Sequence, residues 1–366
     1  QIARCFRDED LRADRQPEFT QIDIEASFIE PEDIMTLTEG MLAMQFKEIG
    51  QDIPVSFERL KYADAMERFG SDRPDLRYEL EIFDASAAFR GSEFSITNSA
   101  LASGGRVRGI RIPGGAALSR KQVDEVEAIA KSAGAGGLIR LKRGATGLEG
   151  PAAKFLSENG VQTLGIGEGE LCVLVAGGEH VSNPALDRVR QDVAQRLSLI
   201  PANNQSFLWV TDFPMFIREQ NGTLSSVHHP FTAPNPDDIA LLDSGPEKVR
   251  ALAYDVVLNG LELGGGSIRI NDPVLQRRVL SLLGVDETTA QARFGFLLDA
   301  LSAGAPPHGG IALGFDRLAM VLAGATSLRD VIAFPKTTAA RALFEDAPSA
   351  VPPEDLRELH LQTMTS

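Results

Sequence analysis

Cysteine and long apolar runs are scarce in this sequence. Its 366 residues contain two cysteines, Cys5 and Cys172, which lie far apart along the chain. Two such residues form neither a disulfide framework nor a zinc site, so we expect two reduced thiols in a cytoplasmic protein. No apolar run reaches the length of about 18 residues that a membrane helix needs, and we therefore expect no membrane contact.

Positive charge is also in short supply. The chain has 36 Lys and Arg against 51 Asp and Glu, which gives a formal net charge of −15. This balance argues against indiscriminate binding to nucleic acid, so any RNA contact must rest on local Arg and Lys. The first residues lack an initiator Met, a basic segment and an apolar stretch. We therefore expect no signal peptide, and a fragment or a chain missing its start.

The first 76 residues predict two strands followed by a helix. Residues 1–30 read as strands around a charged loop, because apolar and polar residues alternate from Phe19 to Phe28. Pro31 then begins a helix, since proline favours the first helical turn. We expect the apolar face of this helix to carry Ile34, Leu37, Met41, Met44 and Phe46.

The composition changes after the turn-rich segment 70–75, which we interpret as a hinge. Residues 80–180 are rich in Gly, Ala and Ser, and β-like runs alternate there with helical patterns. That alternation suits a small α+β or α/β insert. The predicted strands are 108–112, 137–141 and 171–176, and the predicted helices are 120–132, 151–159 and 184–197.

The strand-rich style of the first segment resumes at about residue 205. Strands are predicted at 207–210, 254–263, 267–270 and 310–314, and helices at 273–283, 287–300 and 315–322. We therefore predict an α+β fold in which an antiparallel β-sheet core, flanked by helices, is interrupted by a small α/β insert. The predicted division is 1–76 and 199–366 for the core and 77–198 for the insert.

Arg7 lies at the end of the first predicted strand, in the run Phe6-Arg7-Asp8-Glu9. Arginine is always charged and forks onto phosphate oxygens, and Glu9 is suited to an adenine amino group or a cation. Taken alone, the same residues also fit a solvated hairpin with surface ion pairs.

Arg317 follows a strand-to-helix junction, in the run Gly314-Phe315-Asp316-Arg317. Glycine allows a ligand to approach the backbone, and an arginine in the first helical turn can reach a phosphate at the positive helix terminus. A helix start with a surface arginine remains the simpler alternative for this run alone.

Asp255 and Glu262 lie seven residues apart on one β-like run. A regular strand would place them on opposite faces, so a shared site needs a bulge or a turn at Asn259-Gly260. Two carboxylates near a triphosphate indicate magnesium, which prefers oxygen ligands. Two exposed acidic residues are the alternative.

Arg269 and the adjacent pair His228-His229 complete the candidates. Arg269 follows three glycines, 264–266, which would let a ligand lie against the backbone while the guanidinium pairs with a carboxylate. Adjacent histidines point apart on a strand, which makes a metal site a poor interpretation. A substrate-contacting loop and a structural histidine both stay open.

Taken together and in order, these runs resemble the class II aminoacyl-tRNA synthetases. Residues 6–25 resemble motif 2 and residues 310–318 resemble motif 3 of that family. Residues 6–21, 228–232 and 330–336 look like the bacterial-type aspartyl-tRNA synthetases in particular, and residues 80–195 resemble the GAD-type insert that those enzymes carry.

The resemblance implies a role for each candidate. Arg7 and Arg317 would be catalytic. The implied ATP-binding residues are Arg7, Asp8, Glu9, Gln16, Glu262, Gly314, Phe315, Asp316 and Arg317. The implied aspartate-binding residues are Arg7, His228 and Arg269, with Gln21 and Asp23 fitting the pocket less well. The implied magnesium ligands are Asp255 and Glu262.

The resemblance also implies the reaction and the partners. ATP and Mg²⁺ would serve to activate L-aspartate, tRNA(Asp) would accept it, and the sequence leaves tRNA(Asn) open. The intact enzyme would be a homodimer. The dimer-forming motif 1, the pocket segment with its aspartate-binding lysine and the anticodon-binding domain have no counterpart here, so we expect this chain alone to be weakly active or inactive.

Two alternatives keep the scaffold and change the function. An asparagine-synthetase-like ligase would form the same adenylate and pass it to ammonia, although the insert and the motif 2 loop argue against it. A tRNA-binding or regulatory paralogue would have no activity. The presence of Arg7, Glu262, Arg269 and Arg317 weighs against that reading.

Overall fold

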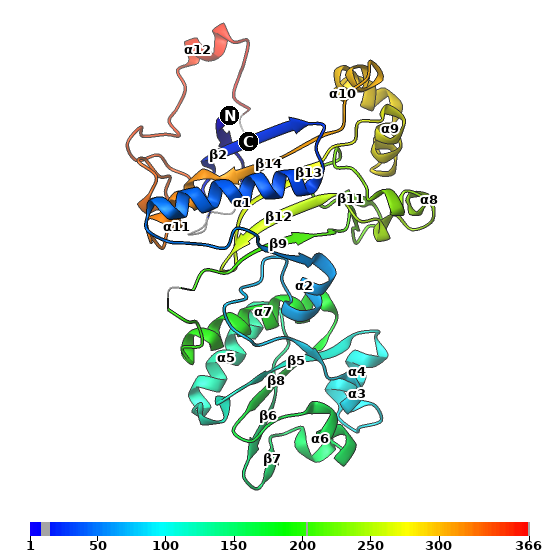
Figure 1. Cartoon of the computed structure of the whole chain (residues 1–366), viewed down its shortest axis with the longest axis vertical. Coiled ribbons are helices and arrows are strands. Elements are labelled where there is room, and N and C mark those ends of the chain that lie inside the picture. The colour runs from blue at the N-terminus through cyan, green and yellow to red at the C-terminus, as the bar shows by residue number, and fades with distance from the viewer. Residues whose placement is uncertain (9–14, 203, 365–366) are drawn as a thin grey trace.

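A seven-stranded sheet forms the upper lobe of the computed structural model, called here the core lobe (Figure 1). The structure describes residues 1–8, 15–202 and 204–364. The strand order is β1-β2-β14-β13-β12-β9-β3, and each described pair is antiparallel except β3 with β9. The predicted antiparallel core is therefore confirmed. Its strands are β1 Ile2–Phe6, β2 Glu18–Ser27, β3 Glu58–Lys61, β9 Phe207–Thr211, β12 Ala253–Leu258, β13 Leu261–Ile268 and β14 His308–Gly314.

Helices cover this sheet and bury its apolar side chains. Helices α1 (Pro31–Glu48) and α11 (Phe315–Leu322) share one buried cluster with Trp209 and Tyr254 of the sheet. Helices α2 (Tyr62–Phe69) and α9 (Pro273–Leu282) contribute to a second cluster. The other elements of this core lobe are β10 Phe216–Arg218, β11 Leu224–Ser226, α8 Leu241–Ser244, α10 Glu287–Ser302 and α12 Pro353–Glu358, with 3-10 turns at Pro236–Asp238, Pro246–Lys248 and Leu328–Asp330.

The buried face of α1 differs from the predicted one. Leu37 and Met44 are 52% and 73% exposed, so their assignment to the apolar face is wrong. The buried residues of the helix are Ile34, Met35, Thr38, Glu39, Leu42 and Phe46. The buried face includes a charged residue, Glu39, which interrupts the apolar pattern in the sequence. Glu39 accepts hydrogen bonds from Trp209 Nε1 and from the Phe57 amide, both at 3.0 Å. A buried acid with such partners cannot be distinguished from a surface acid by periodicity.

A five-stranded antiparallel sheet forms the second lobe, called here the insert lobe. Its order is β4-β5-β8-β6-β7. This antiparallel pairing is that of an α+β lobe, so the α/β class predicted for the insert is wrong. The elements are β4 Phe83–Asp84, α3 Ser86–Phe89, α4 Ser95–Ala102, β5 Arg106–Ile112, α5 Arg120–Ser132, β6 Ile139–Gly144, β7 Gly147–Glu149, α6 Glu158–Leu164, β8 Leu171–Gly177 and α7 Glu179–Arg196, with 3-10 turns at Gly115–Ala117 and Ala153–Phe155.

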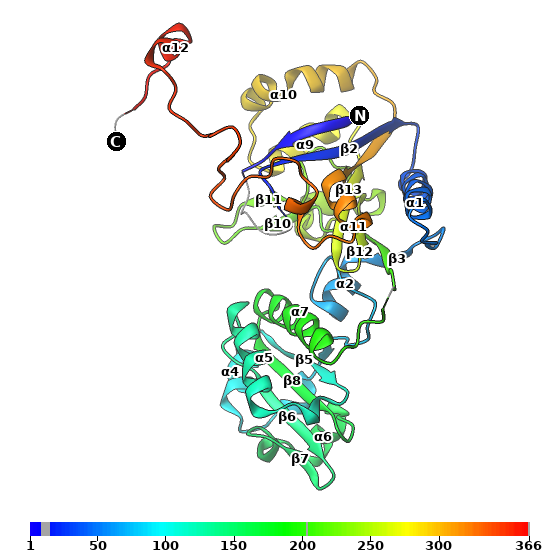
Figure 2. The same ribbon diagram turned by 90° about the vertical axis from the view of Figure 1, so that its left-hand side faces the viewer.

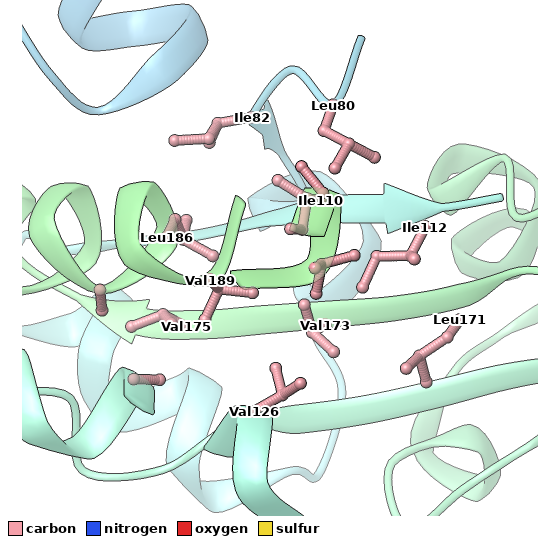
Figure 3. Close-up of a cluster of buried hydrophobic side chains, with 14 of the residues drawn as sticks. Leu80, Ile82, Ile110, Ile112, Val126, Leu171, Val173, Val175, Leu186 and Val189 are labelled. Carbon is pink, nitrogen blue, oxygen red and sulfur yellow. The ribbon is translucent and has the colours of Figure 1, made fainter. Parts of the chain in front are cut away.

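The insert lobe has its own apolar cores on the two faces of its sheet. One core joins α5 and α7 to β5 and β8 through Val126, Leu186, Ile110 and Val173 (Figure 3). The other core contains Phe89 of α3 and Leu164 of α6, with further residues from the opposite face of the sheet. Alternate residues of β8 therefore point into different cores, which explains why this strand reads as continuously apolar.

Two predicted helices of the insert have different bounds. The helix predicted at 184–197 begins at Glu179, and Pro184 lies inside its second turn rather than at its start. The segment predicted as helix 151–159 is instead a 3-10 turn followed by α6. Ser157 marks the start of that helix, because its side chain accepts the Gly160 amide at 3.1 Å.

The C-terminal segment that carries α12 projects away from both lobes (Figures 1 and 2). Several large apolar side chains are exposed along it, among them Leu343, Phe344 and Met364. Within the described residues, no helix is both long enough and apolar enough to cross a lipid bilayer.

Candidate active site

Two adjoining pockets open beside strands β2, β13 and β14. The first, called the arginine pocket, is lined by Arg7, Arg15, Gln16, Phe19, Thr20, Gln21, Glu262, Leu263, Gly264, Ala312, Gly314, Asp316, Arg317 and Leu328. The second, called the histidine pocket, is lined by Gln1, Arg7, Gln21, Asp23, Ile24, Glu25, His228, His229, Gly265, Gly266, Arg269, Ile311 and Ala312. Arg7, Gln21 and Ala312 line both, so a ligand with two polar ends can occupy the two pockets together.

Arg7 and Arg317 bring two guanidinium groups to the arginine pocket. The amide of Arg7 donates to the Pro17 carbonyl at 2.9 Å, and its guanidinium lies 5.2 Å from the ring centre of Phe19. Arg317 is the third residue of α11 and donates to the Glu262 carbonyl at 2.7 Å. Two fixed cations beside an aromatic ring can bind phosphate oxygens next to a planar base.

The other motif residues around α11 have different surroundings. Asp316 accepts the Thr20 amide at 2.7 Å, so its carboxylate fastens α11 to β2 at the pocket wall. Gly314 precedes the helix and lines the arginine pocket. Phe315 is 44% exposed and is absent from the lining of both pockets, as is Asp8. Glu9 lies outside the described residues.

Gln16 presents a buried donor to the arginine pocket. Its side-chain oxygen accepts the Lys336 amide at 3.0 Å, which orients the side chain. Its Nε2 is buried and has no hydrogen-bond partner among the described residues. A buried donor without a partner is costly, and a ligand acceptor in the pocket would relieve that cost.

Asp255 and Glu262 come together because the hairpin between them is irregular. The register shifts between Val256 and Val257, and both turn residues have positive φ, Asn259 at 53° and Gly260 at 84°. The turn predicted at Asn259-Gly260 is thus confirmed, and the register shift lies before it, between Val256 and Val257. Gly265 lies opposite Asp255, and a side chain there would collide with the Asp255 carboxylate.

The two carboxylates interact electrostatically with a third, Asp72. Burial raises the pKa of Glu262, the charge of Asp255 adds to that rise, and Arg317 opposes it. Partial desolvation and then the charge of Asp255 raise the pKa of Asp72, although this residue is exposed at the surface. No three His, Cys, Asp or Glu side chains of the described chain lie close enough together to hold a metal ion by themselves. Asp255 and Glu262 fit a cation that shares its ligands with a substrate, as magnesium does with phosphates.

Arg269 is the best-connected cation of the histidine pocket. Its guanidinium donates to both carboxylate oxygens of Glu25, at 2.9 and 3.1 Å, and to His229 Nε2 at 2.7 Å. Burial, followed by the charge of Arg269, lowers the pKa of His229 to about 4, so the ring is neutral and can accept that bond. The bidentate geometry is the one that an incoming carboxylate would need.

His228 faces a different partner from its neighbour, in agreement with the expectation that the two rings point apart. Its Nε2 lies 3.8 Å from Asp255 Oδ1, and its ring packs edge-on against Phe213 at 4.8 Å. Its Nδ1 is buried and has no hydrogen-bond partner among the described residues, and the same holds for Asp23 Oδ1. Both atoms belong to residues that line the histidine pocket.

Two residues of the site were missed in the sequence. Asp72 lies in the segment that the sequence predicts only as a hinge, and Glu25 lies near the end of β2, two residues after the pocket candidate Asp23. The pattern of alternating acidic residues in β2 could have indicated Glu25. A charged pair, Asp72-Arg73, inside a turn next to a proline was the available signal for the other.

Comparisons with known proteins match nearly the whole chain. A family model described as tRNA synthetases class II (D, K and N) matches residues 1–338. An aspartate–tRNA(Asp/Asn) ligase from Thermoanaerobacter sp. (strain X514) is 50% identical over 368 residues, which cover 99% of this chain. An aspartate–tRNA ligase from Bacillus licheniformis is also 50% identical, over 369 residues and 99% of the chain.

The match covers only part of those relatives. The chain spans 62% of the length of each of the two. A solved structure, the aspartyl tRNA synthetase from Entamoeba histolytica, aligns with 91% of this chain and 46% of its own, at 16% identity and with a TM-score of 0.44.

Proposed function

The chain belongs to the class II tRNA synthetases of the D, K and N group, and from that premise we propose that it is the catalytic part of an aspartate–tRNA ligase. The reaction would convert L-aspartate and ATP to aspartyl-adenylate with release of pyrophosphate, and then transfer the aspartyl group to the 3′ end of tRNA with release of AMP. One observation carries the proposal: Arg7 lines both adjoining pockets, so one cation can serve the phosphate and the amino acid.

The arginine pocket supports the ATP-binding role. We assign the α-phosphate to Arg7 and the far phosphates to Arg317, with adenine near Phe19 and Gln16 Nε2, which has no partner among the described residues. Attack of a carboxylate on the α-phosphorus brings two negative groups together. Fixed guanidinium groups offset that repulsion and stabilise the pyrophosphate that leaves. An aspartate carboxylate is already ionised at neutral pH, so the first step requires no protein base.

Asp255 and Glu262 are the proposed magnesium ligands. When bound, the ion would neutralise charge on the phosphate oxygens. The hairpin irregularity and the glycine opposite Asp255 support this role, because together they leave room for the two carboxylates side by side. Asp72 adds further negative charge nearby.

The histidine pocket supports recognition of the aspartate side chain. We assign the side-chain carboxylate to Arg269, where it would share the guanidinium with Glu25 or replace it. His228 and Asp23 each have a buried polar atom without a partner in the described chain, which suits contacts to a small polar substrate. In the second step, the terminal ribose hydroxyl of tRNA would attack the carbonyl carbon of the aspartyl-adenylate and displace AMP, with the phosphate of the adenylate as the expected base.

The remaining parts of the proposal concern the whole enzyme. The division into 1–76, 77–198 and 199–366 is supported by separate buried clusters in the two lobes. A homodimer in the cytoplasm is proposed from the family. Acceptance of tRNA(Asn) stays open, because relatives named for Asp/Asn and for Asp alone are equally similar, at 50%.

The test is aspartate-dependent exchange of pyrophosphate into ATP by this chain, with asparagine and with no amino acid as controls. The proposal predicts exchange with aspartate and none in the two controls, at a low rate in keeping with the weak activity expected of this chain. Lack of exchange together with lack of ATP binding in calorimetry would favour the regulatory alternative. A product assay separates the second alternative, because an asparagine-synthetase-like ligase would yield free asparagine from ammonia instead of aspartyl-tRNA.

A further inference from the structure

One segment of the chain, residues 70–77, lies between the insert lobe and the proposed magnesium hairpin. It leaves the end of α2 and leads into the insert, and both α2 and α7 lie at the junction of the lobes (Figures 1 and 2). Packing at its start is tight, since a Cβ on Gly70 would lie 2.6 Å from the Asn183 carbonyl of α7. A displacement of the insert lobe would therefore displace the segment with it.

Arg190 of α7 holds this segment from the insert side. It is fully buried, and it donates to the Asp75 carbonyl at 3.2 Å and to the Leu80 carbonyl at 2.6 Å. Its guanidinium also packs against the rings of Phe69 and Tyr78, at 4.8 and 4.9 Å. A planar fork that binds two carbonyls between two rings fixes the orientation of the segment as well as its distance.

The β12–β13 turn rests on the other side of the same segment. A Cβ on Gly260 would lie 3.3 Å from the Asp75 Cβ and 3.8 Å from the Arg73 carbonyl. Asp75 is itself fixed, because Arg77 donates to its carboxylate at 2.7 and 3.0 Å. This turn joins the strands that carry Asp255 and Glu262, so a shift of Asp75 would be transmitted to both carboxylates.

A second buried arginine of the insert provides a contrast. Arg108 of β5 is also fully buried, and it donates to the Met66 carbonyl at 3.3 Å, to the Glu67 carbonyl and to Asn183 Oδ1. These contacts attach the insert to α2 and do not include residues 72–75. Both arginines are thus buried and bear the same desolvation cost, but Arg108 binds carbonyls of α2 whereas Arg190 binds the segment at Asp75.

We propose that Arg190 is a positioning residue for metal-bound ATP: through the Asp75 carbonyl it holds residues 72–75 against the β12–β13 turn and so fixes the arrangement of Asp255 and Glu262. The inference rests on the proposed function, since it assigns those two carboxylates to a cation. It gives the insert lobe a role in the chemistry of the core, exerted from outside both pockets.

The test measures binding of Mn²⁺ with ATP by electron paramagnetic resonance, and binding of ATP without metal by calorimetry in EDTA. Arg190→Met should weaken Mn²⁺·ATP about tenfold while metal-free ATP changes less than about twofold. Arg108→Met is the matched control, because it also removes a buried arginine from carbonyl partners. It should leave both affinities within about twofold once the fraction of folded protein is known. Arg190→Lys should recover part of the loss.

A second pair of variants reaches the same contact from the core side and stays informative if Arg190→Met does not fold. Gly260→Ala places a methyl group against Asp75, whereas Gly284→Ala has nearly the same φ, 79° against 84°, with no atom within 4 Å of the new Cβ. Only Gly260→Ala should weaken Mn²⁺·ATP selectively.

Three results would overturn the inference. The first is equal loss in the Arg190 and Arg108 variants, the second is no loss in the Arg190 and Gly260 variants, and the third is equal loss of metal-bound and metal-free ATP. Failure of the unaltered chain to bind Mn²⁺·ATP would instead remove the proposed function, and this inference with it.

Discussion

The two lobes use arginine in opposite ways. In the core lobe, Arg7, Arg269 and Arg317 line pockets, and their partners include a carboxylate and a carbonyl at the pocket wall. In the insert lobe, Arg108 and Arg190 are fully buried and bind backbone carbonyls. A carboxylate partner can be exchanged for a ligand carboxylate or phosphate, whereas a buried carbonyl cannot leave. The arginines that line the pockets can therefore contact a ligand directly, whereas Arg108 and Arg190 act only through the backbone that they hold.

The two lobes also differ in formal net charge. Residues 77–198 carry 15 Lys and Arg against 14 Asp and Glu, while the rest of the chain carries 21 against 37. The negative surplus therefore belongs to the core, where the pocket arginines are a local exception. Global charge says little about anion binding here, because a few fixed cations in a pocket outweigh a distant, screened surplus.

The largest expected effect is on Arg7. Arg7→Ala removes the cation shared by both pockets, and the rate of aspartate-dependent exchange should fall by about a thousandfold or more. Urea unfolding should be almost unchanged. The control is Arg218→Ala, a surface arginine 3.1 Å from Glu247, which should keep full exchange. Normal exchange by the Arg7 variant would contradict the assignment of this residue.

Substitution of Arg108 should lower stability and leave exchange almost unchanged, the reverse of the effect expected at Arg7. Arg108→Met leaves the Glu67 carbonyl and Asn183 Oδ1 without this donor, while the Met66 carbonyl keeps only the Gly70 amide, so the free energy of unfolding should fall by about 3 kcal/mol. Exchange per folded molecule should stay near that of the unaltered chain. Equilibrium denaturation and an active-site titration measure the two quantities. Loss of exchange without loss of stability would break the comparison between the lobes.

Arg269 should affect one substrate only. Arg269→Lys keeps the charge and loses the bidentate fork, so KM for aspartate should rise about thirtyfold, which corresponds to about 2 kcal/mol, with KM for ATP nearly unchanged. Initial rates at varied aspartate and varied ATP test this. An increase confined to KM for ATP would place the aspartate carboxylate elsewhere.

The smallest expected effect is a pH dependence from His229. Its pKa is lowered to about 4 in the folded chain, against about 6.5 when it is exposed, so the folded state binds fewer protons between these values. Stability from the neutral ring is complete above pH 6.5 and is lost as the pH falls toward 4. Partial solvent screening limits the loss to about 1 kcal/mol.

The matched measurement is urea unfolding of the unaltered chain and of His229→Gln at pH 7 and at pH 4.5. Because glutamine does not titrate, the unaltered chain should lose about 1 kcal/mol more than the variant. An identical pH dependence of the two proteins would show that the ring is not held neutral.

The sequence predicts much of the core because its patterns are local. Strand alternation and the proline at the start of α1 were sufficient there, and the hairpin irregularity between Asp255 and Glu262 followed from strand parity. The face of α1 was mispredicted because Glu39 is a buried acid whose partners, Trp209 and Phe57, are distant in sequence. The same cause hid Glu25 and Asp72, whose roles depend on Arg269 and on the hairpin. No local pattern reports such partners.

A crystal structure of this chain with a non-hydrolysable aspartyl-adenylate analogue tests the central claim most directly. The account predicts that the phosphate contacts Arg7, that the side-chain carboxylate contacts Arg269 in place of or beside Glu25, and that the base lies near Phe19 and Gln16. A phosphate remote from Arg7, or a side-chain carboxylate remote from Arg269, would contradict it.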